Sequence, residues 1–493
     1  MSSVGPRGMA EDTFRGVLWT SGGRVATQFV SVLFGIFLAR LLGPEEFGLV
    51  GMIAVVTGFA TLFSDLGLGA AMIHAQDTRE EQWSSVFWVN IGVGLALTAV
   101  VAALAPLVAR FFGNPLLTPV MIALSAGFAI AGLGIVPSTL LKKKLEFKRL
   151  TRVEASALVV SGTTGIGLAL AGAGVWSLVG QSLSAAAARV VFLWREAGWT
   201  PGRRCRWEDV RRLAGFSSNA LAFSVINYWL RNGDNLLVGK FIGAAALGLY
   251  ARCYSLMLLP LTSVSRSLAD VLFPTFSRIQ ENRPRVAQAY VRCTQAVAAI
   301  TFPMMTGLCI LADPFVRAVY GDAWVAMVPI LQVFCPVGAL QSIGTLNGTL
   351  YLSQGRSGRQ LAVGTIVGVL GLGSIAWGLR HGLIGVATYY AIFSVAVFLP
   401  SMQMAVSLVG LSALGIVRNL LNVIACSAIM GLVVWTVDRW VLAGSAYWIR
   451  LGVGIALGVA VQIGALRVFR VPAWDDVSGL TRRLIATARA PAP

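Results

Sequence analysis

The segment FLARLLGPEEFGLV (residues 37–50) recurs 200 residues later in the chain as LVGKFIGAAALGLY (residues 237–250). Overlaying the two segments places Arg40 on Lys240 and Gly48 on Gly248. Both copies lie within long apolar runs. The chain therefore reads as one membrane unit that has been duplicated.

A second pair of segments supports this repeat. APLVARFFGNP (residues 105–115) aligns with DPFVRAVYGDA (residues 313–323) at a nearly equal offset, which places Gly113 on Gly321. Duplicated membrane halves are typical of transporters, whose substrate lies at the interface between the repeats. The sequence thus favours a transporter over an enzyme.

The composition places the chain in a bilayer. Of its 493 residues, 56% are hydrophobic and only 12% are charged, which is too apolar for a soluble core. The apolar runs are mostly longer than the ~20 residues needed to cross a membrane. We therefore predict an all-α integral membrane protein with about fourteen transmembrane helices, counted by run length.

The repeat divides these helices into parts. We expect an N-terminal lobe of six helices at residues 1–200 and a C-terminal lobe of six helices at residues 201–410. Two extra helices at 411–470 and a tail at 471–493 would follow. Because six is an even number, both lobes enter the membrane in the same direction and form parallel repeats.

The net charge of +18 is distributed as a topology signal. Basic residues gather in alternate connections, which predicts that these connections and both termini are cytoplasmic. This bias explains the charge without nucleic acid, and we expect none as a partner. The first apolar run is too long for a cleavable signal peptide, so we expect a multi-pass protein of a bacterial inner membrane. The basic segments are residues 142–152, 195–212, 278–292, 356–359 and 467–489.

Metal and catalytic chemistry have little support in the sequence. The six cysteines are scattered without the spacing of a metal site, and His74 and His381 fall at predicted helix ends. We therefore expect no metal, no cofactor and no catalytic residue.

Ionisable residues inside apolar helices are the candidates for function, because each is costly at bilayer depth. In the predicted helix 17–42, Arg24 and Gln28 share one face with Ser31. In the equivalent helix 213–242, Asn227, Arg231 and Asp234 also share a face. The offset of 200 places the two stripes on matching faces, as a shared central cavity requires.

The neighbouring predicted helices add further charges: Asp65 in helix 47–73, and Arg252, Arg266 and Asp270 in helix 247–276. Arginine predominates, and its planar fork donates two parallel hydrogen bonds to the oxygens of a pyrophosphate. The alternative is that ion pairs such as Arg231 with Asp234, or Arg266 with Asp270, lock the helix bundle. The candidate substrate-binding residues are Arg24, Gln28, Asp65, Asn227, Arg231, Asp234, Arg252, Arg266 and Asp270.

Four segments resemble a known family. They are residues 16–50 (beginning GVLWTSGG), FSDLGLGAAMI (63–73), LKKKLEFKRL (141–150) and residues 319–356 (beginning VYGDAW). They are similar to the Wzx-type polysaccharide transport flippases of the multidrug/oligosaccharidyl-lipid/polysaccharide (MOP) superfamily. Within that group, the chain most resembles exporters of colanic-acid-like and succinoglycan-like exopolysaccharides.

The resemblance implies a pair of six-helix lobes arranged as a V, with helices 1, 2, 7 and 8 lining a cationic cavity. It implies that the substrate is an undecaprenyl-diphosphate-linked oligosaccharide, flipped by alternating access for exopolysaccharide or lipopolysaccharide biosynthesis. A coupling cation and a complex with a polysaccharide polymerase are compatible with this role and stay open.

Two other functions compete with this interpretation. A cation-coupled multidrug exporter of the same superfamily needs an unpaired carboxylate in the membrane, for which Asp65 is the candidate. A membrane polysaccharide polymerase or ligase needs catalytic groups on a large extracytoplasmic loop. The surplus of arginine argues against the first, and the cytoplasmic position of the longest connections argues against the second.

Overall fold

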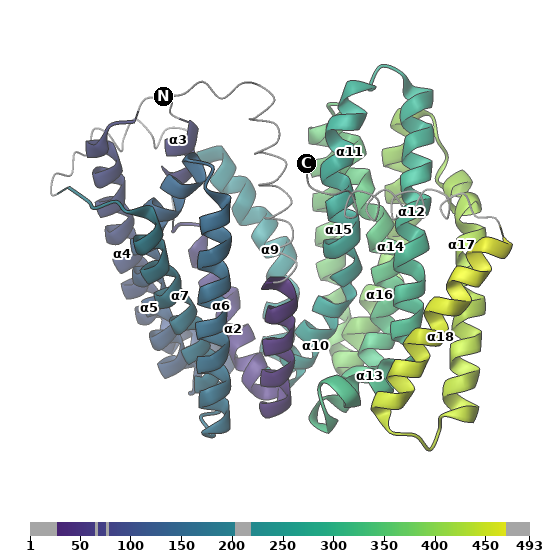
Figure 1. Ribbon diagram of the computed structural model, residues 1–493, viewed down its shortest axis with the longest axis horizontal. Helices are drawn as coiled ribbons and strands as arrows, with labels where there is room; N and C mark the ends of the chain where they lie inside the picture. The colour runs from purple at the N-terminus through teal and green to yellow at the C-terminus, as the bar shows by residue number, and fades with distance from the viewer. Residues whose placement is uncertain (1–26, 65–67, 75–77, 203–217, 470–493) are drawn as a thin grey trace, which may run out of the picture. The chain divides into compact units, whose positions relative to one another are not determined.

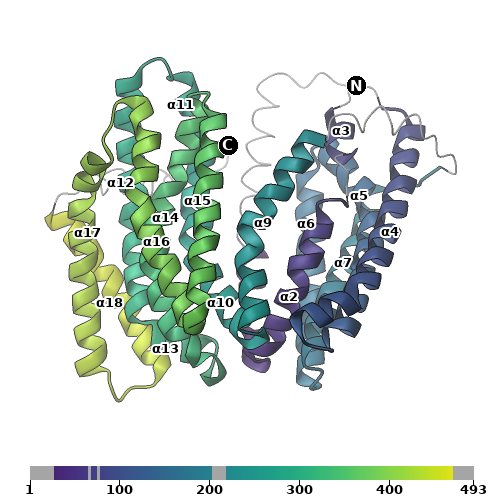
Figure 2. The same ribbon diagram turned by 180° about the vertical axis from the view of Figure 1, so that it is seen from behind.

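The computed structural model describes residues 27–64, 68–74, 78–202 and 218–469. The chain divides into two compact units, Met1–Gly248 and Leu249–Pro493. Every regular element in the described residues is a helix (Figures 1 and 2), so the predicted all-α class is confirmed. The division lies near the midpoint of the chain, whereas the lobe boundary expected from the repeat, at residue 200, stays a prediction.

The first helix of the described residues is Thr27–Leu41. In the first unit α4 packs along α5, α6 packs along α7, and α2 contacts α9. Helix α10 starts in this unit and continues into the second. The labelled helices are α2 (Pro44–Thr61), α3 (Leu68–His74), α4 (Glu80–Phe112), α5 (Leu117–Lys143), α6 (Phe147–Leu170), α7 (Val175–Ala197), α9 (Ser218–Phe241) and α10 (Ala244–Met257).

In the second unit α12 lies between α14 and α17, and α18 packs on α17. The main helices are α11 (Arg266–Arg278), α12 (Arg283–Ile310), α13 (Ala312–Val319), α14 (Val328–Ser353), α15 (Ser357–Gly378), α16 (Gly382–Val406), α17 (Ala413–Thr436) and α18 (Tyr447–Val468). Short helical turns, η1 (Leu261–Ser265), η2 (Asp322–Met327), η3 (Leu379–His381), η4 (Ser407–Val409) and η5 (Val437–Val441), join or extend them.

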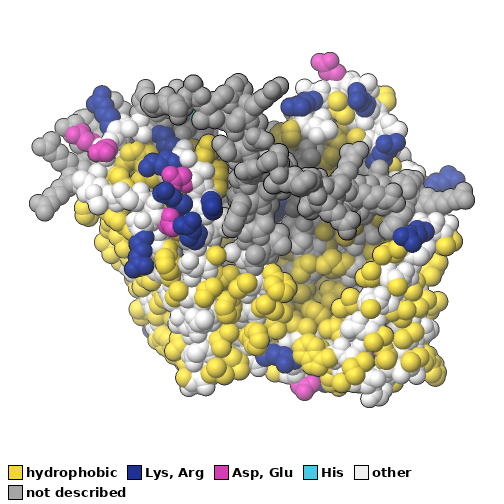
Figure 3. Space-filling model, in the orientation of Figure 1, with side chains coloured by type: hydrophobic (Ala, Val, Ile, Leu, Met, Phe, Trp, Pro, Cys, Tyr) yellow, Lys and Arg dark blue, Asp and Glu magenta, His cyan; other side chains and the backbone are white. Residues whose placement is uncertain are grey.

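Ten stretches of the described chain are long and apolar enough to cross a membrane. Many large apolar side chains are exposed on them, including Trp435 and Trp448, which suits lipid contact. Figure 3 shows hydrophobic side chains over the lower part of each unit and basic side chains at its upper end. A multi-pass membrane protein is therefore confirmed, while the count of fourteen spans stays a prediction.

The glycines of the second repeated segment share a positive φ but differ in ψ. Gly113 ends α4 with φ 75° and ψ 23°, whereas Gly321 follows α13 with φ 92° and ψ 176°. A positive φ is open to glycine at little cost, so each glycine allows the chain to turn after a helix. The structure thus supports the alignment of these two segments.

The first repeated segment forms a crossing of backbones. A Cβ atom on Gly48 of α2 would lie 1.7 Å from the carbonyl oxygen of Ala244, and one on Gly248 of α10 would lie 1.9 Å from that of Pro44. All four residues belong to the first unit. The starts of α2 and α10 therefore touch through two glycines at equivalent repeat positions.

Two predicted helices are interrupted. The helix expected at 47–73 consists of α2, which ends at Thr61, and the separate α3, which starts at Leu68. The helix expected at 247–276 contains the π-helical turn η1 directly after Pro260. Proline has no N–H to donate, so the regular hydrogen-bond ladder is lost there and the helix adopts a wider turn.

Candidate functional site

The polar face of α9 is the most clearly formed of the predicted stripes. Arg231 and Asn227 are exposed on α9, as the helical spacing requires. Within the described chain Arg231 forms no ion pair and no hydrogen bond through its side chain. The pairing of Arg231 with Asp234, one of the two locking contacts considered above, is therefore not formed. An exposed, unpaired guanidinium in an apolar helix is available to an anion.

Contacts with α2 fix the orientation of this face. The Tyr228 hydroxyl donates a hydrogen bond to the carbonyl oxygen of Val55 over 2.6 Å, and its ring lies 5.8 Å from that of Phe59. Tyr228 thus ties α9 to α2. Because Arg231 is three residues further along the helix, its side chain emerges beside this contact.

Asp234 differs from its neighbours because it is buried. Only 6% of the residue is exposed, and Oδ1 accepts a hydrogen bond from the backbone N–H of Asn235 over 2.8 Å. A buried carboxylate that already accepts hydrogen bonds is better suited to stabilising its helix than to meeting a substrate.

The equivalent helix at Thr27–Leu41 also exposes its polar face. Gln28 and Ser31 are exposed, and no atom lies within 4 Å of where a Cβ of Gly35 would be. Arg24 lies outside the described residues. The face on which Arg24 was predicted therefore continues through Gln28 as an open polar stripe.

The remaining candidates fall into two groups. Arg252 in α10 is half-buried, and Arg266 at the start of α11 is exposed without an ion pair to a described residue. Asp65 lies outside the described residues, and so does the side chain of Asp270. The pairing of Arg266 with Asp270 accordingly stays a prediction.

The second unit contains an apolar groove that the sequence did not reveal. Its volume is about 600 Å³, and α12, α13, α17 and α18 supply most of its walls. Gln462 is the only residue among those lining it with a polar side chain, and neither of its amide atoms has a hydrogen-bond partner in the described chain. The other lining residues are Leu256, Leu259, Ala299, Ile300, Pro303, Met304, Gly307, Leu308, Leu311, Phe315, Met430, Val434, Leu451, Gly454, Ile455, Gly458, Val459, Ile463 and Leu466.

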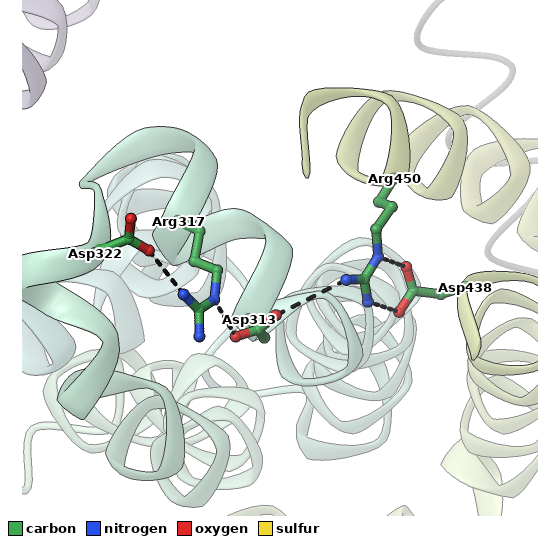
Figure 4. A network of polar contacts seen from close by, with 5 residues as sticks. All are labelled: Asp313, Arg317, Asp322, Asp438 and Arg450. Atoms are coloured by element: carbon green, nitrogen blue, oxygen red, sulfur yellow. Dashed lines mark hydrogen bonds and ion pairs between the residues drawn. The ribbon is translucent and has the colours of Figure 1, made fainter. Parts of the chain in front are cut away.

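Ion pairs lie beside one end of this groove (Figure 4). Arg450 of α18 makes two parallel hydrogen bonds to Asp438, of 2.8 and 2.7 Å, and approaches Asp313 at 3.9 Å. Arg317 links Asp313 to Asp322 over 2.9 and 2.7 Å. These residues alternate in sequence with groove-lining positions of α13 and α18. The network thus fixes the α17–α18 hairpin to α13.

No metal site accompanies these features in the part of the chain that is described. No group of three or more His, Cys, Asp or Glu side chains that could hold an ion occurs there. The five cysteines described are all free. The structure therefore offers polar helix faces and an apolar groove, which are the parts of a binding and transport site.

Ten stretches apolar enough to cross a membrane, with exposed polar residues on α9 and on the helix Thr27–Leu41, define a multi-pass membrane protein. The profile of the family described as "Polysaccharide biosynthesis protein" matches residues 37–329. The chain belongs to this family, and the predicted relationship to Wzx-type members is confirmed.

Relatives are similar over most of their length. The chain is 29% identical to the teichuronic acid biosynthesis protein TuaB of Bacillus subtilis, over 92% of this chain and 93% of TuaB. It is 27% identical to the lipopolysaccharide biosynthesis protein WzxC of Escherichia coli, over 71% of each chain. The succinoglycan biosynthesis transport protein ExoT of Rhizobium meliloti is 26% identical over 65% of each chain.

Solved structures confirm the fold. The lipid II flippase MurJ in an inward closed conformation aligns with a TM-score of 0.74 at 14% identity, over 93% of this chain and 99% of MurJ. An inward-facing multidrug resistance transporter of the MATE family, also of the MOP superfamily, aligns with a TM-score of 0.59 at 16% identity, over 78% and 95% of the two chains. The MOP fold is therefore shared, and the substrate has to be argued from this chain's own residues.

Proposed function

We propose that this member of the polysaccharide biosynthesis family flips oligosaccharides linked to undecaprenyl diphosphate across the bacterial inner membrane. The observation that carries the proposal is Arg231, which lies on the exposed polar face of α9 and has no ion-pair partner among the described residues. Family membership and the names of TuaB, WzxC and ExoT support polysaccharide units as the cargo. Transport needs no bond to be broken, so no catalytic residue is required.

The head group of such a lipid carries two phosphates. Arg231 donates a planar pair of N–H groups that matches phosphate oxygens, and Asn227, one turn away, adds an amide that can donate to a sugar or phosphate oxygen. Arg24 occupies the corresponding stripe of the first repeat. We propose that these side chains hold the diphosphate during transport. Arg252 and Arg266 of the second unit stay predicted substrate-binding residues.

The groove in the second unit suits the other half of the molecule. A polyprenyl chain has no hydrogen-bonding groups, so a cavity of about 600 Å³ with one polar lining side chain is a favourable surface for it. Gly454 and Gly458 have no side chain, so they leave space in the groove along α18. A lipid-linked cargo therefore accounts for both the cationic face and the apolar groove.

A drug exporter explains these features less well. A cationic drug requires a membrane carboxylate, whereas the exposed charged group on α9 is an arginine and Asp234 is buried. The family description refers to polysaccharide biosynthesis and not to drug transport. The exporter stays the second candidate only through the shared MATE fold.

Replacing Arg231 tests the proposal. Arg231→Ala removes charge-assisted hydrogen bonds worth about 1.5–3 kcal/mol, so binding of the lipid-linked substrate should weaken about ten- to a hundredfold. Export is measured in cells that depend on this protein, and binding with purified protein and undecaprenyl-diphosphate-linked sugar. Arg110→Ala is the matched control, because Arg110 is also exposed and unpaired but ends α4, away from the polar faces. Equal export and binding in both variants would exclude the role of Arg231.

A groove-filling substitution tests the lipid half separately. Gly458→Leu extends a side chain from a position where a Cβ already lies 3.4 Å from Met430 Sδ, so it should occupy the space of the polyprenyl chain. Gly452→Leu, in the same helix, has no atom within 4 Å of its Cβ position and serves as control. We expect weaker binding of polyprenyl-linked substrate in the first variant and unchanged binding of a head group without its chain.

A further inference from the structure

The basic end of the second unit differs from that of the first in how its charges are paired. Seven arginines are exposed there, and none forms an ion pair with a described carboxylate: Arg278, Arg283, Arg285, Arg292, Arg356, Arg359 and Arg418. Glu281 is the one acidic residue among the helix connections of this end. In the view of Figure 3, several basic side chains and a single acidic one appear at the upper end of this unit.

The corresponding end of the first unit neutralises part of its charge. Arg149 and Arg152 both bind Glu196, at 3.7 and 2.8 Å, and Arg189 binds Glu154 at 2.6 Å. A need for positive charge in cytoplasmic connections accounts for both ends equally. It does not account for why these three arginines of the first unit have carboxylate partners while the seven named in the second unit have none among the described residues.

A small cavity lies beside Arg292, one of these seven arginines. Its volume is about 400 Å³, and its walls are Ala287, Gln288, Val291, Arg292 and Gln295 of α12, with Leu411 before α17. The Gln295 amide donates a hydrogen bond to the Asn419 carbonyl over 3.1 Å, which holds α12 against the start of α17. Arg418 precedes Asn419. Apolar walls under guanidinium and amide groups match a molecule with an anionic head and an apolar body.

We propose that this cavity binds the head group of an anionic phospholipid from the surrounding membrane. The cavity lies at the starts of α12 and α17, two stretches apolar enough to cross the bilayer, which is the depth at which lipid head groups lie. Arg292 in the cavity wall contacts the phosphate, and Arg418 at the start of α17 adds positive charge nearby. Gln288 donates to the phosphate oxygens, and Val291 and Leu411 meet the first acyl carbons. The site is distinct from the substrate-binding faces proposed above.

An acidic protein segment is the other class of partner with the right charge. The lipid is favoured because the cavity walls include three apolar side chains and because the arginines follow the ends of membrane-spanning helices. A lipid is also present at this depth at all times, whereas a protein must be recruited.

The experiment measures lipid retained by the purified protein. Wild type and variants are exchanged into micelles containing phosphatidylglycerol or phosphatidylcholine with identical acyl chains, and bound lipid is counted by native mass spectrometry. Wild type should retain phosphatidylglycerol preferentially. The double variant Arg292→Gln/Arg418→Gln should lose about fivefold in affinity for each arginine removed. Arg149→Gln/Arg152→Gln, which removes the paired arginines of the first unit, should change little.

Four results would overturn the proposal. One is equal retention of both lipids by wild type, and another is an equal loss in the two double variants, which would indicate general surface charge. The third is displacement of the lipid by millimolar inorganic phosphate, which would indicate a simple anion site. Gln288→Trp keeps every charge and narrows the cavity, so it should weaken lipid binding too; unchanged binding would also count against the site. Since no readout depends on export, failure here leaves the flippase proposal untouched.

Discussion

Gly48 and Gly248, 200 residues apart in the sequence, occupy equivalent positions in one helix crossing. Gly48 lies against the backbone of Ala244, and Gly248 lies against the backbone of Pro44. Each glycine therefore leaves room for the residue four positions before the other. This reciprocity is what a two-fold relationship between repeated segments produces at the place where the segments meet.

Any side chain at this crossing should force the helices apart. Gly48→Ala and Gly248→Ala place a methyl group within 2 Å of a carbonyl oxygen, and backbone atoms cannot rotate away as a side chain can. We expect each variant to lose at least the ~1–3 kcal/mol typical of overpacking, measured as a lower melting temperature of the purified protein. Gly92→Ala, which has no neighbour within 4 Å, is the control. Unchanged melting of both crossing variants would contradict the contact.

The ion pair between Arg450 and Asp438 should matter for stability. Both side chains are largely buried, at 16% and 11% exposed, so Arg450→Ala leaves an uncompensated carboxylate and should cost about 3–5 kcal/mol. Arg450→Met/Asp438→Leu should recover much of that loss, because it removes both charges. Arg152→Ala breaks a pair whose arginine is 59% exposed and should cost at most ~1 kcal/mol. Thermal melting in detergent distinguishes these outcomes.

Arg231→Lys should restore only part of the binding lost in Arg231→Ala. Lysine keeps the positive charge but offers a point ammonium in place of the planar fork. Affinity for undecaprenyl-diphosphate-linked sugar should therefore fall between wild type and the alanine variant. Full recovery with lysine would mean that charge alone matters at this position and that the two-point geometry is irrelevant.

The proposed topology is testable by labelling. In a background without the natural cysteines, Lys144→Cys should not react with an impermeant thiol reagent applied to intact cells, because positive connections stay cytoplasmic. Ala443→Cys, in the exposed connection before α18, should react. Position 144 is preferred to 143 because the Lys143 ammonium already donates to Thr78 Oγ1 over 2.8 Å and to the Met72 carbonyl. The reverse labelling pattern would mean that the protein has the opposite orientation in the membrane.

Periodic features were predictable from the sequence, and features made by distant neighbours were not. The shared exposed face of Arg231 and Asn227 follows from helical spacing alone. The matching turn positions of Gly113 and Gly321 follow from the repeat. The groove could not be predicted from the sequence, because its lining residues are as apolar as those of a lipid-facing surface. Whether Gly458 faces lipid or a cavity depends on α12, about 150 residues earlier.

The interrupted helices show a second limit of prediction from the sequence. Apolar composition continues through residues 47–73, so the end of α2 at Thr61 left no hydropathy signal. In the helix predicted at 247–276 the signal was present, since Pro260 precedes the π-helical turn, but a proline within an apolar run also occurs in uninterrupted membrane helices such as α4. The contact between Arg450 and Asp313 could not be predicted either, because the two residues lie far apart in the sequence.

The hairpin of α17 and α18 forms one wall of the apolar groove, yet it lies outside the two repeats predicted from the sequence. A gene duplication produces two equivalent polar faces, but it cannot by itself produce a groove with a wall that belongs to neither copy. If the proposed function holds, we expect sugar preference and lipid preference to depend on different parts of the chain. Exchanging residues 411–469 between relatives should transfer the tolerance for lipid chain length without altering which oligosaccharide is exported.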